Sequence, residues 1–404
     1  MAAAAPGAGV AVAGATASFP VTSGAPVDDD VLKGVGELVE VRRVDPTTCG
    51  GGRGLFARDK ISAGTVVARE RAFLRVPTER EAGETLHAAM AREALQLLAE
   101  GGQAAELTRQ RLAVLHPREL GELDAETIDK GYTMHSDALT RLCDGPGGAG
   151  LSRADALRLL LVCQFNGFTS GLYCRLAMIN HRCDPNCAKF TPVDGAEGAA
   201  DLSEIVAVRD IEGDEEITIS YLTPFELSHG RRDEIFREQH LFPVGPSPFA
   251  SDLDTPPNPR LEALLDELEG APASAEERLK RALEVDAMCR AEAPCGFLVA
   301  RVAKELSRAI LQIMPSGAID ASLVVQLVRS IQALLGLQRR YLPPHHHELG
   351  TTLIDYHNAL EHAIANHADA LYAAFPAELG SFRLASRADF KAKKEGRKIQ
   401  KVYT

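Results

Sequence analysis

The segment INHRCDPNCAKF, from Ile179 to Phe190, is dense in side chains that can do chemistry. His181, Cys183 and Cys187 are residue types that bind metal ions or take part in nucleophilic catalysis. The same segment holds two asparagines and an Asp-Pro-Asn turn sequence. It is therefore compatible with a metal site, a nucleophile with its base, a disulfide turn or one wall of a cofactor pocket.

Spacing alone leaves these alternatives open, although it favours some over others. A structural zinc site usually has four ligands, often in C-x2-C pairs, and no C-x2-C sequence occurs in the chain. A Cys–His nucleophile pair needs a third group to orient the base, and the neighbouring sequence indicates none. Without further context, the simplest interpretation is a tight turn packed by small buried cysteines, with His181 as a core histidine.

The composition is typical of a folded intracellular protein. The chain has 404 residues, of which 45% are apolar, and eight unevenly spaced cysteines that do not resemble a secreted disulfide scaffold. The net charge of −12 disfavours nucleic-acid binding through overall charge. No apolar run reaches the roughly 18 residues that a membrane span needs. We expect a protein of the cytoplasm, the nucleus or both, with no membrane association and no direct nucleic-acid binding.

Strands are predicted in the N-terminal part and again beyond the middle of the chain. Residues 31–44 are rich in β-branched side chains, and residues 59–76 hold two short strand-like runs that predict a hairpin around Ala63 and Gly64. Strand character returns at residues 203–208 and 216–221. The sequence SHGRRDEIFREQHLF then predicts a short helix that ends at Phe242 and Pro243.

Helical periodicity dominates elsewhere. Residues 79–161 have apolar side chains at helical spacing, interrupted by glycines between 145 and 150. A stretch rich in proline, glycine and serine follows Phe242, and amphipathic helical segments begin near Arg260. Their succession suggests an array of two-helix units, without a fixed-period motif. The C-terminal tail is basic, which indicates a solvated end or, alternatively, a nuclear-localisation or nucleic-acid contact.

Three separated segments resemble, in the same order, the SET-domain protein methyltransferases of the SMYD-type branch. They are GRGLFARDKISAGTVV, then CQFNGF followed by GLYCRLAMINHRCDPNC, and finally VAVRDIEGDEEITISYL. The resemblance covers roughly residues 31–76 and 159–242, and HHHELGTTLIDYHNAL resembles the helical-repeat domain of such chains. A match to one segment is weak evidence, but three in order are a strong signal.

The resemblance implies that S-adenosyl-L-methionine is the cofactor. The implied cofactor-binding residues are Gly52, Arg53, Gly54, Asn166, Asn180, His181 and Phe242. The glycine turn would let the backbone approach the methionine part of the cofactor, and the two asparagines would hydrogen-bond to it. His181 would act mainly through its backbone on the adenine, and Phe242 would pack on the cofactor.

Tyr221 matches the catalytic tyrosine of the family, and His240 lies where a second tyrosine of the lysine channel is expected. Methyl transfer to an amine needs the cofactor and a neutral lysine held end to end, so positioning dominates catalysis. A tyrosine suits this task because it carries a polar tip on a rigid apolar body. An imidazole at position 240 can line the channel, but its positive charge would repel a cationic substrate.

The sequence departs from the family pattern in ways that remove zinc sites. Residues 77–157 hold a single cysteine, so the MYND zinc finger is absent and a helical insert is predicted in its place. The three cysteines of the post-SET element are replaced by Val244, Pro246 and Phe249, so we expect no zinc at Cys183. Arg182 replaces the serine of the family's NHSC sequence.

These observations predict an α+β fold with a split SET domain and a helical, TPR-like C-terminal domain. The expected organisation is a disordered leader (1–30), the two SET halves (31–78 and 158–243), a helical insert (79–157), a linker (244–259), a helical-repeat domain (260–385) and a basic tail (386–404). The expected function is lysine methylation of histone or other proteins by a monomeric enzyme. The alternative is an inactive SET-like scaffold that binds a protein partner through its C-terminal helices.

Overall fold

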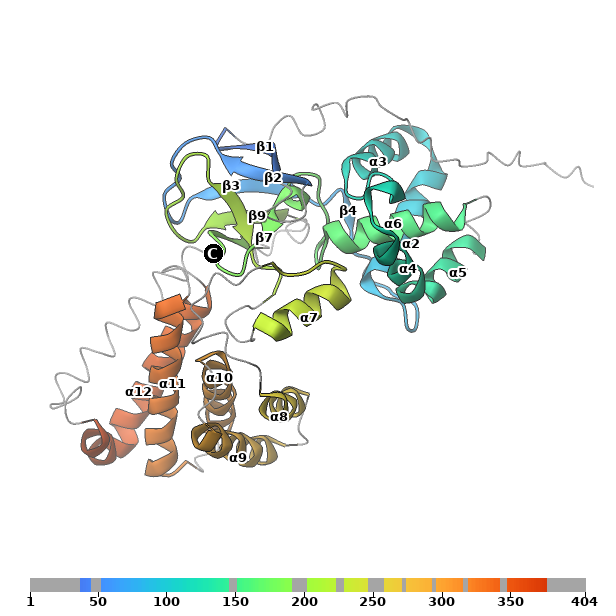
Figure 1. Cartoon of the computed structure of the whole chain (residues 1–404). Helices are drawn as coiled ribbons and strands as arrows, with labels where there is room; N and C mark the ends of the chain where they lie inside the picture. The colour runs from blue at the N-terminus through green and yellow to red at the C-terminus, as the bar shows by residue number, and fades with distance from the viewer. Residues whose placement is uncertain are drawn as a thin grey trace, which may run out of the picture. The chain divides into compact units, whose positions relative to one another are not determined.

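The computed structural model describes residues 37–44, 52–144, 151–190, 202–222, 229–245, 258–270, 274–292, 296–314, 319–341 and 347–375. The predicted leader, most of the linker and the basic tail lie outside these ranges. The predicted α+β class is confirmed, because small sheets and many helices make up the described residues (Figure 1). Contacts divide the chain into two compact units, one containing residues 72–174 and the other residues 32–71 and 175–404.

The unit of residues 72–174 is mainly helical, as the apolar spacing predicted. Its elements are β4 (Leu74–Arg75), α2 (Leu86–Glu100), α3 (Gly102–Val114), η2 (Leu120–Glu122), α4 (Ala125–Met134), α5 (Ser136–Asp144), α6 (Arg153–Asn166), β5 (Gly167–Phe168) and β6 (Gly171–Leu172). Thr85, Asp124 and Ser152 cap α2, α4 and α6 by accepting backbone hydrogen bonds. The three short strands pair in the order β4-β6-β5.

A partly buried ion pair joins Arg92 of α2 to Glu84, which lies just before the helix begins. Arg92 donates from Nε and Nη2 to the two carboxylate oxygens of Glu84, over 2.9 and 3.0 Å. The Glu84 side chain is 5% exposed. The hydrogen bonds from Arg92 hold the pKa of Glu84 below its usual range.

The substitution Glu84→Gln is expected to lower the free energy of unfolding by about 2 kcal/mol at pH 7, since it weakens two charge-assisted hydrogen bonds. Because the pKa of Glu84 is lowered in the folded state, this contribution is present above the unfolded-state pKa of about 4.3 and is lost as the pH falls through the folded-state value. Urea titrations at pH 7 and pH 3 measure the difference. Glu126→Gln is the control. It removes an exposed helix ion pair with Lys130 and should leave the free energy of unfolding almost unchanged. An equal loss of unfolding free energy at pH 7 and pH 3 would show that the charge of Glu84 does not stabilise the fold.

Two sheets form the β part of the second unit. One has the order β1-β2-β10-β7 and contains β1 (Val39–Val44), β2 (Gly52–Ala57), β10 (Glu216–Ile219) and β7 (Asn180–His181). The other has the order β3-β9-β8 and contains β3 (Val66–Arg71), β9 (Leu202–Ala207) and β8 (Cys187–Phe190). The short helix η3 (Leu176–Met178) precedes β7, and α7 (His229–Gln239) begins after residues 223–228.

The hairpin predicted around Ala63 and Gly64 does not form. Ile61 instead exchanges two backbone hydrogen bonds with Ile211, of 2.9 and 2.8 Å, and β3 pairs along its length with β9. Both strand-like runs thus find partners in the distant segment 202–211. Local turn residues predicted the bend correctly, but they carry no information about which strand completes the ladder.

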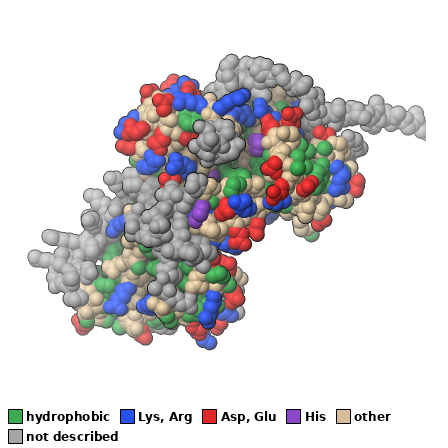
Figure 2. Space-filling view, in the orientation of Figure 1, with side chains coloured by type: hydrophobic (Ala, Val, Ile, Leu, Met, Phe, Trp, Pro, Cys, Tyr) green, Lys and Arg blue, Asp and Glu red, His purple; other side chains and the backbone are tan. Residues whose placement is uncertain are grey.

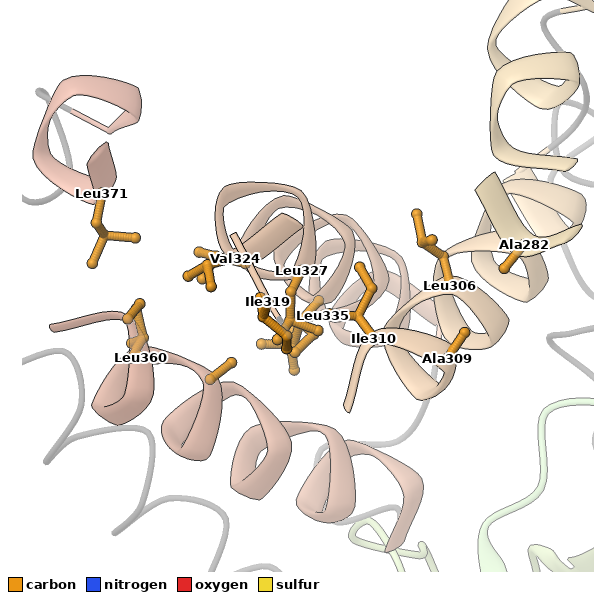
Figure 3. Close-up of a cluster of buried hydrophobic side chains, with 14 of the residues drawn as sticks. Ala282, Leu306, Ala309, Ile310, Ile319, Val324, Leu327, Leu335, Leu360 and Leu371 are labelled. Atoms are coloured by element: carbon orange, nitrogen blue, oxygen red, sulfur yellow. The ribbon is translucent and has the colours of Figure 1, made fainter. Parts of the chain in front are cut away.

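The described C-terminal part of this unit consists of helices that begin near Arg260, as the sequence predicted. They are α8 (Pro259–Glu269), α9 (Ala275–Glu292), α10 (Gly296–Ile313), α11 (Ala321–Tyr341) and α12 (His347–Ala374). Successive helices pack on one another, and their apolar faces share a core that includes Leu306, Leu327 and Leu360 (Figure 3). On the face drawn in Figure 2, Lys and Arg side chains alternate with Asp and Glu.

Helix α11 contains a stretch, Ala321–Arg339, that is long and apolar enough to cross a membrane by length and composition alone. A search for uninterrupted apolar runs in the sequence does not predict this stretch. Val324, Leu327, Val328 and Ile331 from this stretch are buried in the helical core. The apolar character of α11 is thus accounted for by packing against its neighbours.

Candidate active site

Three neighbouring strands bring separate motifs of the sequence together. β10 lies between β2, with which it is antiparallel, and β7, with which it is parallel. At this point the side-chain nitrogen Nδ2 of Asn180 donates to the backbone oxygen of Arg53, over 3.1 Å, and to Oε1 of Glu216, over 2.7 Å. The sheet order therefore places the glycine-containing start of β2 and the asparagine of the INH segment side by side.

Gly52, Arg53 and Gly54 do not form the turn expected from the sequence: they begin β2 and pair with Val44, Arg43 and Arg42 of β1. The two glycines have different physical reasons to be glycine. Gly52 has a φ of 118°, which other residues rarely adopt. Gly54 has ordinary backbone angles, but a Cβ atom there would lie 2.6 Å from Oε1 of Glu216 and 3.1 Å from Nδ2 of Asn180. A side chain at position 54 would thus displace the contact between Glu216 and Asn180.

Tyr221 is held at both its backbone and its hydroxyl. It follows β10, whose parallel pairing places Ile219 opposite His181. The backbone N–H of Tyr221 donates to Nδ1 of His181 over 3.0 Å, and the hydroxyl donates to the backbone oxygen of Ile179 over 2.7 Å. The tyrosine ring therefore has a defined position relative to β7.

Tyr221 belongs to a group of five packed rings. Phe236, which is fully buried on α7, has its ring centroid 4.4 Å from that of His181 and 4.8 Å from that of His240. Leu241, with a left-handed φ of 62°, ends the helical turn, and Phe242 follows with its ring 5.4 Å from Phe236. We call His181, Tyr221, Phe236, His240 and Phe242 the ring cluster. Phe242 is 41% exposed, so the cluster reaches the surface.

Burial keeps both histidines of the ring cluster neutral at physiological pH. Desolvation lowers the pKa of His181 to about 3, and the charge of Arg232, together with that of His240 when it is protonated, acts in the same direction. Desolvation also lowers the pKa of His240. His240 therefore carries no positive charge near neutral pH, and it does not repel a cationic substrate there.

The hydrogen bonds of His181 fix its tautomer. Nδ1 accepts from the Tyr221 backbone, so Nε2 carries the proton and points towards Sγ of Cys183 at 3.5 Å. Among the described residues no group of three or more His, Cys, Asp or Glu side chains is arranged to hold a metal ion. Val244 is described, whereas Pro246 and Phe249 lie outside the described residues, so the absence of zinc stays a prediction.

Asn166 belongs to the other unit, at the end of α6. Its Nδ2 donates to the backbone oxygens of His116, over 2.5 Å, and Val162, over 2.8 Å. The amide thus links the loop after α3 to the last turn of α6. Its predicted contact with a cofactor stays a prediction, as do the roles of the other site residues.

The sequence reading missed Glu216 and Phe236. Glu216 lies in the acidic run D-E-E, which is typical of a solvated turn. Phe236 is a single aromatic in a strongly charged helix, four residues before His240. The spacing of four was the available signal, because side chains at i and i+4 lie on the same face of a helix.

The side chain of His181 is expected to position Tyr221. His181→Phe keeps a ring in the cluster but removes the acceptor of the Tyr221 N–H, so we expect kcat to fall about 10-fold with the KM for the cofactor unchanged. His181→Asn places an amide oxygen close to the position of Nδ1. It should retain more of kcat while lowering Tm, because the smaller side chain leaves a cavity. Equal kcat values for the two variants would exclude this role.

Comparisons with known proteins agree with this geometry. A family model described as SET domain matches residues 52–222. Histone-lysine N-methyltransferase SMYD3 of Homo sapiens is 42% identical over 72 residues, which are 18% of this chain and 15% of that protein. The protein of the same name from Mus musculus is 40% identical over 72 residues, with the same shares covered. The matched segment thus spans about 15% of the length of these curated relatives.

Residues 52–222 therefore form a SET domain. Within that class, the similarity to the two SMYD3 proteins supports a SET protein of the SMYD type.

Proposed function

We propose that the protein is an S-adenosylmethionine-dependent protein-lysine N-methyltransferase. The observation that carries the proposal is the fixed position of Tyr221, whose backbone N–H and hydroxyl are both hydrogen-bonded to the INH segment. The SET domain and the methyltransferase activity for which the SMYD3 proteins are named support the same reaction class.

The residues present fit the cofactor at two places. Asn180, Glu216 and the Arg53 backbone oxygen offer hydrogen-bond acceptors that suit an ammonium group. The ring cluster offers aromatic faces, which stabilise a cation such as a sulfonium by about 0.5–2 kcal/mol. When bound, S-adenosylmethionine supplies a methyl group on a positively charged sulfur.

The side chains of this site position the acceptor amine and exclude water. Because the Tyr221 hydroxyl proton is used by Ile179, the phenol oxygen is left as an acceptor for an N–H of the substrate lysine. Such a contact orients the amine lone pair, and positioning of this kind contributes up to roughly 7–11 kcal/mol in ideal geometries. The neutral His240 ring leaves this region without an added positive charge.

A labelling experiment tests the proposal. The purified chain is incubated with S-adenosylmethionine labelled on the methyl group and a cell lysate, and labelled proteins are identified by mass spectrometry. Methylated lysines in target proteins support the enzyme. Cofactor binding without any labelled product would support the inactive scaffold instead.

We further propose that the substrates are histone or other intracellular proteins and that the C-terminal helices bind a protein partner. The name of the two similar proteins, histone-lysine N-methyltransferase SMYD3, supports a histone substrate. The helical-repeat character of residues 260–385 and the position of the domain boundaries remain expectations from the sequence. Deleting residues from 260 onwards, followed by the same labelling experiment, would show whether substrate choice depends on these helices.

A further inference from the structure

The carboxylate of Glu216 has no established partner of opposite charge in this site. No ion pair joins it to a cation, and its one hydrogen bond is to Asn180, as far as the described residues show. The residue is half-buried at the start of β10, between β2 and β7. A partly desolvated carboxylate without a cation is unfavourable, so this arrangement suits a ligand that brings positive charge.

The neighbouring amide of Asn180 has only one possible orientation. Both of its close partners, Oε1 of Glu216 and the backbone oxygen of Arg53, are acceptors, so the Nδ2 nitrogen must face them. The two N–H groups of the amide are thereby used. The remaining atom, Oδ1 of Asn180, has no hydrogen-bond partner within the described ranges, and it can only accept.

We propose that Glu216 is a specificity-determining residue that selects cofactors carrying an α-ammonium group, through its own charge and by turning the Asn180 amide so that it accepts. This inference rests on the proposed function. An ammonium group donates three hydrogen bonds and is attracted by the carboxylate, whereas a ligand with a neutral or anionic group here gains neither contact. A Cβ at position 54 would push Oε1 of Glu216 away from the amide.

The competing explanation is that Glu216 only ties β10 to β7. In that case its replacement would change stability, and it would weaken every ligand of the site to the same extent. If Glu216 selects an ammonium group, its replacement should instead weaken the binding of ligands that carry this group more than the binding of ligands that lack it. The two explanations are separated by comparing one ligand with its analogue that lacks the α-amino group.

The experiment is isothermal titration calorimetry of the full chain with S-adenosylhomocysteine and with its deamino analogue. The wild type is expected to bind S-adenosylhomocysteine about 10- to 100-fold more tightly than the analogue. Glu216→Gln should lose most of this preference, by weakening S-adenosylhomocysteine about 10-fold or more and the analogue less than about twofold. Glu212→Gln, at an exposed carboxylate paired with Lys60, is the matched control.

The result that overturns the inference is an equal change in the affinity of both ligands, or no change, in Glu216→Gln. If that variant does not fold, Glu216→Met replaces the carboxylate by an apolar chain of similar volume and must show the same loss of preference. A wild type that binds neither ligand would contradict the proposed function itself. A wild type that prefers S-adenosylhomocysteine yet methylates nothing would contradict only the enzyme assignment and leave the inference standing.

Discussion

Replacing Tyr221 with phenylalanine is expected to lower the rate of methyl transfer by about 100-fold or more, because the phenol oxygen that orients the substrate amine is lost. The ring remains in the ring cluster, so the affinity for S-adenosylmethionine should stay within about threefold of the wild type. Single-turnover kinetics with a labelled cofactor, together with calorimetric titration of S-adenosylhomocysteine, measure the two effects separately.

The same substitution removes the hydrogen bond to the buried Ile179 backbone. An unsatisfied buried carbonyl costs about 1–3 kcal/mol, so a lower Tm is expected alongside the loss of rate. Tyr173→Phe is the matched control, since that hydroxyl also donates to a nearby group, Ser170, in the unit of residues 72–174. Unchanged methylation by Tyr221→Phe would exclude Tyr221 as the catalytic tyrosine.

Introducing a permanent charge at position 240 is expected to have the second large effect. His240→Arg places a cation that stays protonated even when buried among Tyr221, Phe236 and Phe242. This is close to where the positively charged sulfur of the cofactor and the substrate lysine would have to meet. We expect kcat/KM to fall by about 100-fold, since like charges in a partly buried site repel strongly. His240→Phe, which keeps a neutral ring, should retain most of the activity and serves as the control.

The pH profile tests the same point without a new charge. Since burial lowers the pKa of His240, the imidazole is neutral near pH 7 and takes up a proton only below its usual value of about 6.5. The wild type should therefore lose kcat/KM at acidic pH, on the acid side of that value. His240→Phe should lose less at the same pH. Superimposable profiles of the two proteins would show that His240 does not titrate within the site.

Local patterns predicted most of the helices and the presence of the strands. The helical spacing after Arg260 is a periodic signal that depends only on neighbours in sequence, and the described residues of this part are helical, from α8 to α12. The motif resemblance likewise identified Asn180, His181 and Tyr221, which the structure brings together. These residues lie close in the fold because β7 and β10 are parallel neighbours.

Contacts between distant segments were the part that sequence patterns did not predict. The strands on either side of Gly64 pair with residues 202–211 rather than with each other, and turn chemistry contains no information on such a choice. Phe236 was missed because its helix is charged on most positions, and Glu216 because acidic runs usually face solvent. In both cases the role depends on a partner far away in the chain.

The position of β10 between β2 and β7 has a consequence for how the chain is made. β1 and β2 are synthesised early, but the edge of β2 stays unpaired until residue 216 has left the ribosome. At about 5–20 residues per second, the synthesis of residues 57–216 takes roughly 10–30 s. During that time the early hairpin exposes a strand edge that can pair wrongly with other chains. Chains that terminate before β10 can never complete this sheet, so premature termination should yield aggregates rather than a smaller active protein.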